Sequence, residues 1–325
     1  MRFSGELLNR EAKATGFRPE ILEKVFQLLH LLKSLLSHPY LRERIVLKGG
    51  TALNLFYFDV PRLSVDIDLN YIGAVDRAVM LQERPEVERA VQAVCSREGF
   101  TIRRQPSDHA GGKWSLRYES GLGAGGNLEV DLNFMFREPL FPFDVLDSKQ
   151  VGSFQTQAVP VIDIHELAAG KLAALLSRQA SRDLYDAHLM LKHWDFNNEM
   201  LRLAFVVYGA MSRKDWRTVS LTDVTYDWQE LENQLVPVLS ESLVAGINIQ
   251  KWTETLVEEC RQSLSNILLP LNDNETEFLT MLNDSGEIMP DLLTGDEGLQ
   301  VKIFAHPLLK WKAQNVRQHR GRMEE

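Results

Sequence analysis

The sequence predicts an α+β fold, in which a mixed β-sheet core with helices is followed by an α-helical C-terminal lobe. Two observations carry this prediction. Strand-like runs and turn-forming glycines concentrate before Pro160, and helical periodicity takes over from residue 163. At 325 residues the chain exceeds the usual size of one domain. We therefore expect a core over residues 1–160 with an N-terminal helix, and a mainly helical domain over residues 161–325 that contributes to the active site.

The elements of the first half follow from local patterns. Residues 18–38 are leucine-rich with helical spacing, residues 83–98 are also typical of a helix, and the alternation in "LSVDIDLNYIG" predicts a strand. "RIVLKGG" predicts a short strand that ends in glycines, with a helix starting at "TALNLFYF". Three further strand-like runs, "FTIRRQPS", "KWSLRYES" and "NLEVDLNFMF", are separated by "DHAGG" and "GLGAGG", which we interpret as hairpin turns. Neither turn has the GK[ST] ending of a phosphate-binding P-loop.

The second half is expected to be helical. "IDIHELAAGKLAALLS", "SRDLYDAHLMLKHW" and "NEMLRLAFVVYGAM" each have helical spacing, and two or three more helices are expected up to about residue 285.

The composition is that of an ordinary soluble globular protein, with 44% hydrophobic and 25% charged residues. There is no apolar run long enough to span a bilayer, and the N-terminus has no apolar signal core. Cys95 and Cys260 lie far apart in the sequence. We expect them to be buried thiols in a reducing compartment, which predicts a cytoplasmic protein.

The net charge of −9 argues at first against a nucleic-acid partner, but the charge is unevenly distributed. Residues 223–297 contain 16 Asp and Glu against Lys251 and Arg261, a local net of −14, whereas the remainder carries 34 basic and 29 acidic residues, a net of +5. We interpret the acidic segment as a solvated helical surface, with docking of a basic partner as an alternative hypothesis. The basic C-terminal tail could follow phosphates or form a solvated helix end.

The strongest constellation lies in "VLKGGTALNLFYFDVPRLSVDIDLN", residues 46–70. Asp66 and Asp68, two residues apart on a strand, point to the same face. At a separation of about 4 Å their charges repel by about 4 kcal/mol, which a proton, a basic side chain or a metal ion must offset. The main-chain N–H groups of Gly49, Gly50 and Thr51 at a helix start can approach phosphate oxygens. Together these features are typical of a site for a Mg²⁺-bound polyphosphate. The alternatives are a solvated strand edge and an ordinary turn.

A third carboxylate is expected from "NLEVDLNF", where Glu129, Asp131 and Asn133 share one face of a strand. If this strand lies beside the Asp-x-Asp strand, three acids converge, which is enough for two metal ions. The pattern alone leaves open a strand with a polar outer face, and it leaves open whether Glu129 or Asp131 is the third acid.

These motifs resemble the nucleotidyltransferase superfamily with the DNA polymerase β-like fold, and more narrowly the AbiEii/AbiGii-type toxins, to which the mycobacterial MenT toxins are related. The resemblance covers roughly residues 45–195. The family pattern is a Gly-Gly-Thr/Ser helix start, an Arg-x-Ser/Thr-x-Asp-x-Asp strand, a third acidic strand and a Lys…Arg-Asp-x-x-Asp helical motif. In this sequence the pattern falls on Gly49, Gly50, Thr51, Arg62, Ser64, Asp66, Asp68, Asp131, Lys171, Arg182, Asp183 and Asp186.

The resemblance implies a nucleotidyltransferase-type core that transfers a nucleoside monophosphate from an NTP, with Mg²⁺, to an acceptor. The expected acceptor is the 3′ end of tRNA. The protein would be the toxin of a type IV, abortive-infection-like toxin–antitoxin pair and would bind a cognate antitoxin. A basic antitoxin could dock on the acidic segment 223–297. The implied metal ligands are Asp66, Asp68 and Asp131, joined in catalysis by Lys171 and Asp186. The implied nucleotide-binding residues are Lys48, Gly49, Gly50, Thr51, Arg62, Ser64 and Arg182.

The helical motif also has a physical reading. Lys171 falls inside the apolar stripe of its expected helix, which is costly without an anionic partner. Its head could reach nucleotide phosphates or extend to water. Arg182 and Asp186, spaced i and i+4, could pair, and that pair could be purely structural.

Other functions stay open. The same core could modify a protein or a small molecule, or the fold could persist as a non-catalytic nucleotide- or partner-binding module. An Asp-x-Asp glycosyltransferase would leave the Gly-Gly-Thr helix start unexplained.

Overall fold

The computed structural model describes residues 2–106, 111–123, 125–178 and 180–323. The chain forms two compact units. Unit 1 comprises Met1–Arg137, Phe143–Ile162 and Leu235–Ile247, and unit 2 comprises Glu138–Pro142, Asp163–Gln234 and Asn248–Glu325. A domain boundary at residue 160 stays a prediction. Within the described ranges, the helices all fall short of the length and apolar character that crossing a bilayer requires.

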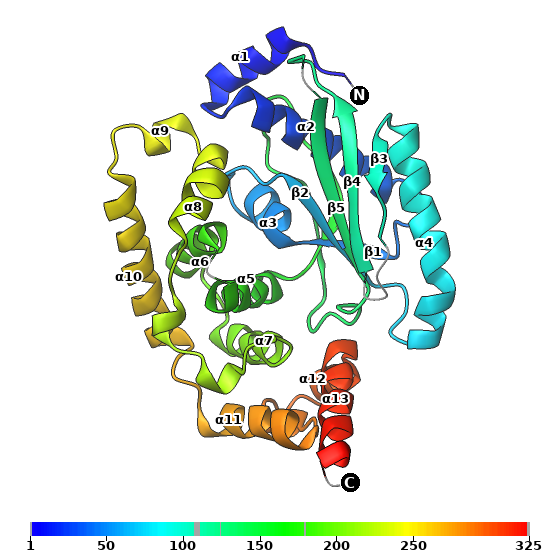
Figure 1. The fold of residues 1–325 in the computed structure, drawn as a ribbon, viewed down its shortest axis with the longest axis vertical. Coiled ribbons are helices and arrows are strands. Elements are labelled where there is room, and N and C mark those ends of the chain that lie inside the picture. The colour runs from blue at the N-terminus through cyan, green and yellow to red at the C-terminus, as the bar shows by residue number, and fades with distance from the viewer. Residues whose placement is uncertain (1, 107–110, 124, 179, 324–325) are drawn as a thin grey trace. The chain divides into compact units, whose positions relative to one another are not determined.

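Unit 1 is built on a mixed seven-stranded sheet with the order β3-β4-β5-β2-β1-β7-β6 (Figure 1). The β2–β5 and β1–β7 pairs are parallel and the other pairs are antiparallel. The α+β fold predicted from the sequence is therefore confirmed. The strands are β1 (Ile45–Lys48), β2 (Asp66–Tyr71), β3 (Thr101–Arg104), β4 (Gly111–Glu119), β5 (Gly125–Asn133), β6 (Asp144–Leu146) and β7 (Val159–Val161).

Two long helices of unit 1 pack on the sheet and on each other. Helix α2 packs on β2 and β5, and α4 packs on β3. The predicted first helix is confirmed as α2, whereas α4 begins six residues before the predicted residue 83, because the Asp76 side chain accepts a hydrogen bond from the Val79 N–H and caps it there. The helices are α1 (Gly5–Thr15), α2 (Pro19–Leu36), α3 (Gly49–Ala52), which continues as the π-helical turn η1 (Leu53–Tyr57), α4 (Arg77–Arg97), the 3₁₀ turn η5 (Val236–Val238) and α9 (Glu241–Val244).

Period-two alternation gives this sheet an apolar face and a polar face. In β5 the side chains of Leu128, Val130 and Leu132 are buried, whereas the residues between them are partly exposed. Trp114 and Leu116 of β4 continue the apolar face. The polar face therefore carries every second residue of β2, β4 and β5, including all the acids of interest.

Two features of the sheet differ from the expectation. Pro160, which we interpreted as the end of the strand-rich half, lies inside β7, and β6 was not predicted. Both strands have three residues, too few to show an alternating pattern. The predicted "GLGAGG" hairpin is confirmed by the antiparallel pairing of Glu119 with Gly125, whereas residues 107–110, which include most of "DHAGG", lie outside the described residues.

Unit 2 is helical, as predicted, and its helices extend past residue 285. In it α5 packs on α6 and α7, and α6 packs on α10 (Figure 1). The basic tail forms α13, where Lys312 Nζ donates to the main-chain oxygen of Ala210 at 2.7 Å. The helices are α5 (Ile164–Arg178), α6 (Ser181–His193), α7 (Asn198–Ala210), α8 (Trp228–Glu230), α10 (Ile249–Ile267), α11 (Asp273–Thr280), α12 (Glu297–Ala305) and α13 (Pro307–Met323); the short turns are η2 (Trp216–Thr218), η3 (Leu221–Asp223), η4 (Leu231–Leu235), η6 (Met281–Ser285) and η7 (Pro290–Leu292).

A buried glutamate holds residues 138–142 within unit 2. The Phe141 N–H donates to Glu166 Oε1 at 3.0 Å, and the Tyr208 hydroxyl donates to Glu166 Oε2 at 2.9 Å. Burial raises the pKa of Glu166 to about 7, although these hydrogen bonds oppose the rise.

Candidate active site

The turn between β1 and α3 is shaped around a carboxylate. Gly49 has a φ of +73°, in the left-handed region that favours glycine. A Cβ built at Gly49 would lie 2.2 Å from Asp68 Oδ2. The missing side chain therefore makes room for the Asp68 carboxylate, which lies directly against the main chain of the turn.

Thr51 and Ser64 join the turn to the start of β2. The Thr51 hydroxyl donates to the main-chain oxygen of Asp66 at 2.6 Å and lies 3.0 Å from Ser64 Oγ. Both residues are buried, as is Arg62, whose Nη1 donates to the Leu63 oxygen at 2.9 Å. These three residues, predicted to bind nucleotide, are placed where their side chains fix the position of the Asp-x-Asp strand.

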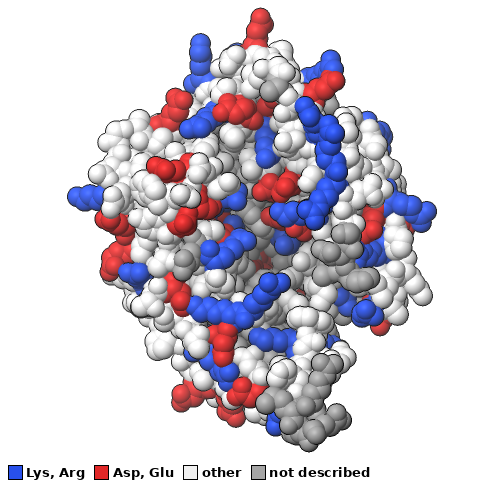
Figure 2. All heavy atoms as spheres, in the orientation of Figure 1, with Lys and Arg blue, Asp and Glu red and all other residues white. Residues whose placement is uncertain are grey.

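The strand of the third acid lies beside the Asp-x-Asp strand, as the sequence analysis required. β2 and β5 run parallel, with Asp68 opposite Asp131 and Asp66 opposite Glu129. Since paired residues of adjacent strands share a face, the four carboxylates lie together on the polar face of the sheet. Figure 2 shows acidic side chains gathered over these strands, next to basic ones.

Two lysines lie among these acids. Lys48 is paired with Asp68 across β1 and β2, and Lys113 is paired with Asp131 across β4 and β5. Lys113 Nζ lies 3.0 Å from Glu129 Oε2, so Glu129 already has a cationic partner. With all groups ionised, the four acids and two lysines leave a net charge of −2. The charge of Glu129 is thus partly neutralised by Lys113 of the neighbouring strand β4.

The pKa of Asp131 reflects this crowding. Burial raises the pKa of Asp131 above its usual range, and the charges of Asp68 and Glu129 raise it further, against the lowering effect of Lys48 and Lys113. A carboxyl whose proton affinity is raised at the edge of an acidic cluster is suited to accept a proton from a substrate.

The donor set suits a hard divalent cation. Asp66, Asp68 and Asp131 supply hard carboxylate oxygens on one face of the sheet, which fits Mg²⁺. Within the residues that the structure describes, no group of three or more His, Cys, Asp and Glu side chains is placed to hold a metal ion. Mg²⁺ does not require one, because it is usually bound by one or two carboxylates together with water and substrate phosphates.

The predicted helical motif forms a charge cluster inside unit 2. Lys171 Nζ lies 3.0 Å from Asp183 Oδ1 and 2.8 Å from Asp186 Oδ2. The side chains of Asp183 and Asp186 are only 2% and 0% exposed, so the lysine in the apolar stripe has the anionic partners that its burial demands. Arg178 lies 2.8 Å from Asp183, and Arg182 lies 3.8 Å from Glu230.

Opposing effects set the pKa of Asp183. Its burial pushes the pKa up, but the charges of Lys171 and Arg178 and the hydrogen bond from Lys171 outweigh burial, and the pKa ends below its usual range. Asp183 is therefore ionised, and it shares Lys171 with Asp186.

Sequence reasoning missed the position of Lys113. Its alternation with buried Trp114 was visible, but its register against Asp131 depends on a hairpin whose length the sequence does not define. It also left Arg178 unassigned, because a lone exposed arginine at the end of a helix carries no distinguishing pattern.

Comparisons with known proteins identify the fold and the family of the chain. A solved structure similar to the chain is MenT4, the nucleotidyltransferase toxin Rv2826c from Mycobacterium tuberculosis H37Rv, with a TM-score of 0.58 and 19% identity over 97% of this chain and 99% of that chain. At this identity the likeness shows the fold. Comparison with curated proteins gives no match. The family profile described as nucleotidyl transferase AbiEii toxin, type IV TA system, matches residues 30–266, which is more than half of the chain. The chain belongs to this AbiEii family of nucleotidyltransferase toxins.

Proposed function

We propose that this nucleotidyltransferase uses Mg²⁺ to transfer a nucleoside monophosphate from an NTP to the 3′ end of tRNA. The observation that carries the proposal is the pairing of Asp68 with Asp131 across parallel strands, with Gly49 shaped to receive the Asp68 carboxylate. A tRNA acceptor would place the reaction in the cytoplasm, where its extension would block aminoacylation and arrest growth. Family membership implies an antitoxin that counteracts this effect.

In the proposed reaction the terminal hydroxyl of the RNA attacks the α-phosphorus of the NTP. A bond forms between the RNA oxygen and phosphorus, the bond to the β-phosphate oxygen breaks, and pyrophosphate leaves. Asp131 accepts the hydroxyl proton as the general base. Asp66 and Asp68 would hold Mg²⁺ together with Asp131, and the ion would stabilise charge on the phosphates when bound.

The other residues have supporting roles in the proposal. Lys48 and the N–H groups of Gly49 and Gly50 would orient the triphosphate, whereas Thr51, Ser64 and Arg62 hold the strand that presents the acids. The assignments of Lys171 and Asp186 to catalysis, and of Arg182 to nucleotide binding, rest on the resemblance alone.

The test is incubation of the purified protein with total tRNA, Mg²⁺ and each labelled NTP in turn, with Asp66→Ala as the control. We expect label on RNA from a preferred NTP, none with the variant, none in EDTA, and none on tRNA whose terminal diol was oxidised with periodate. Label on a protein or a small molecule would keep the transferase and refute the tRNA acceptor. Label that survives oxidation of the tRNA terminus would refute the 3′ end as the site of addition.

A further inference from the structure

We infer that the outer strands of the sheet in unit 1 form a docking surface for the phosphate backbone of the RNA acceptor. The surface consists of Arg103, Arg104 and Arg117, and we call it the β3–β4 arginine face. It deepens the proposed function, on which the identity of its partner rests, and it involves no residue assigned to catalysis above.

A bulge in β3 creates part of this face. Ile102 pairs with Leu116 and Arg104 pairs with Ser115, so that Arg103 is an extra residue in the strand. Without the shift, the alternation would put Arg104 opposite buried Trp114. With the bulge, both arginines are exposed, which is the re-aiming of side chains that bulges commonly produce.

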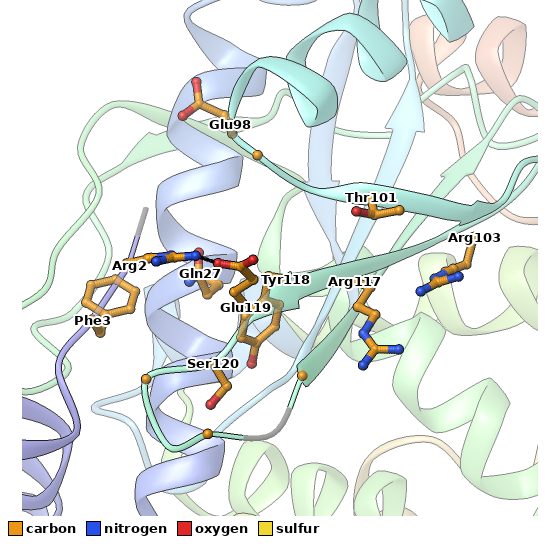
Figure 3. A pocket seen from close by; sticks show the side chains of 14 residues that line it. Arg2, Phe3, Gln27, Glu98, Thr101, Arg103, Arg117, Tyr118, Glu119 and Ser120 are labelled. Carbon is orange, nitrogen blue, oxygen red and sulfur yellow. Dashed lines mark ion pairs between the residues drawn. The ribbon is translucent and has the colours of Figure 1, made fainter.

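Arg117 is positioned by a glycine on the neighbouring strand. A Cβ at Gly125 would lie 2.6 Å from Arg117 Nε, so the arginine side chain lies across the space that Gly125 leaves open. The "GLGAGG" turn therefore does more than reverse the chain. Figure 3 shows Arg117 and Arg103 extending from neighbouring strands on the same side of the sheet.

The three guanidinium groups are available for a ligand. Within the part of the chain that the structure describes, no carboxylate lies within ion-pair distance of Arg103, Arg104 or Arg117. Several other exposed arginines of unit 1 are paired with nearby glutamates, as Arg89 is with Glu86 and Arg42 is with Glu43. The arginine face is thus a local excess of three positive charges.

The arginine face borders a polar cavity of about 930 Å³ at the end of the β4–β5 hairpin (Figure 3). Arg103 and Arg117 line it, together with Glu98 and Glu119. Both acids have cationic partners: Glu98 lies 3.2 Å from Arg97, and Glu119 pairs with Arg2, which also lines the cavity. The cavity therefore keeps the positive charge of Arg103 and Arg117, which suits a phosphate-bearing ligand.

The arginine face continues the polar face that carries the catalytic acids. Arg117 pairs with Asn127 of β5, four residues from Asp131, which corresponds to about 13 Å along the strand. A strand of RNA whose terminal hydroxyl lies at Asp131 would therefore reach the arginines a few nucleotides upstream. Planar guanidinium groups on exposed side chains are suited to phosphate oxygens, and contacts to phosphate confer no base preference.

The test compares Arg103→Gln/Arg104→Gln/Arg117→Gln with the wild type in two assays: tRNA binding by fluorescence anisotropy without NTP, and label transfer at increasing tRNA concentration. We expect the variant to bind tRNA at least about 10-fold more weakly and to have a raised KM for tRNA, with kcat and the KM for NTP unchanged. The slope of log affinity against log salt should become shallower by about 2 to 3, because each phosphate contact contributes about 0.7–0.9.

A matched control removes the same charge elsewhere in unit 1. Arg10, Arg42 and Arg89 have side chains that are 73%, 68% and 71% exposed, and the corresponding Gln variants should bind tRNA as the wild type does. The triple Lys variant of the arginine face should retain most of the salt slope, which separates loss of charge from misfolding.

Each outcome decides between the two proposals. Unchanged tRNA binding by the Gln variant of the arginine face, or an equal loss in the control variant, would overturn the docking surface while leaving the tRNA transferase intact. Salt-dependent tRNA binding that the Gln variant loses, without any transfer to tRNA by the wild type, would retain the surface and refute the proposed reaction. Absence of tRNA binding by the wild type would overturn the docking surface.

Discussion

Substitution of Gly49 by alanine tests whether the glycine turn serves the Asp68 carboxylate. The added Cβ would lie 2.2 Å from Asp68 Oδ2, whereas real contacts of this kind stay above 3.0 Å, so the carboxylate must retreat by about 1 Å. A misplacement of this size in catalytic machinery costs about 100-fold in rate, or about 2.7 kcal/mol of transition-state stabilisation. The left-handed backbone adds about 1–2 kcal/mol of destabilisation, and the displaced side chain about 0.5–1.5 kcal/mol.

The chain offers a matched control for the backbone cost. Gly246 has a φ of +74°, against +73° at Gly49, but a Cβ there would meet nothing within 4 Å. We expect Gly246→Ala to lose about 1–2 kcal/mol in urea denaturation and to keep its transfer rate. Gly49→Ala should lose slightly more stability and about 100-fold in kcat. Equal transfer rates in the two folded variants would refute the claim that the turn positions Asp68 for catalysis.

Three further predictions concern other carboxyl groups and their partners. Asp131→Asn should lower transfer by about 100-fold or more, whereas Glu129→Gln should cost less than about 10-fold, because that carboxylate is already paired with a lysine; steady-state transfer rates compare them. The stability of Glu166→Gln relative to the wild type should rise by about 2.5 kcal/mol between pH 5 and pH 8 in urea denaturation, since a pKa raised from 4.5 to about 7 makes the wild type lose stability as pH rises through that range; a constant difference would contradict the buried pKa. Lys171→Met should destabilise unit 2 by about 3–5 kcal/mol by removing the cation that the buried carboxylates of Asp183 and Asp186 share. Adding Asp186→Asn should recover part of that stability, and recovery of transfer along with it would argue against a catalytic lysine.

Much of the candidate site could be predicted because its signals are local. The same-face placement of Asp66 and Asp68 follows from the strand period, and the glycine turn and the strand of Asp131 have clear patterns of their own. Convergence of the three acids required that the strand of Asp131 lie beside the Asp-x-Asp strand, and β5 does pair with β2. The need of Lys171 for an anionic partner could also be predicted locally, since the helical period places this lysine in the apolar stripe of its helix.

What could not be predicted depends on register between distant strands. Lys113 lies opposite Asp131 only because the β4–β5 hairpin closes at Glu119 and Gly125, and a shift by one residue would turn it to the other face. The bulge at Arg103 is equally invisible, because an extra residue in a strand leaves the sequence pattern nearly unchanged. Burial of Thr51 likewise depends on where the chain returns as β2.

Arg117 and the acids can share the polar face because Arg117 is separated from Asp131 along the strands. Arg117 and Asp131 are about 13 Å apart by strand register, which exceeds the screening length of about 8 Å at physiological ionic strength. A phosphate held at Arg117 therefore meets little repulsion from the acids. In the proposed reaction the group that RNA delivers to Asp131 is a neutral hydroxyl, which these acids do not repel. A face with uniform positive charge would attract RNA as well but could not hold a cation, and a uniformly acidic face would repel the backbone. Four residues of β5 therefore separate the position of phosphate binding at Arg117 from the position of metal binding at Asp131.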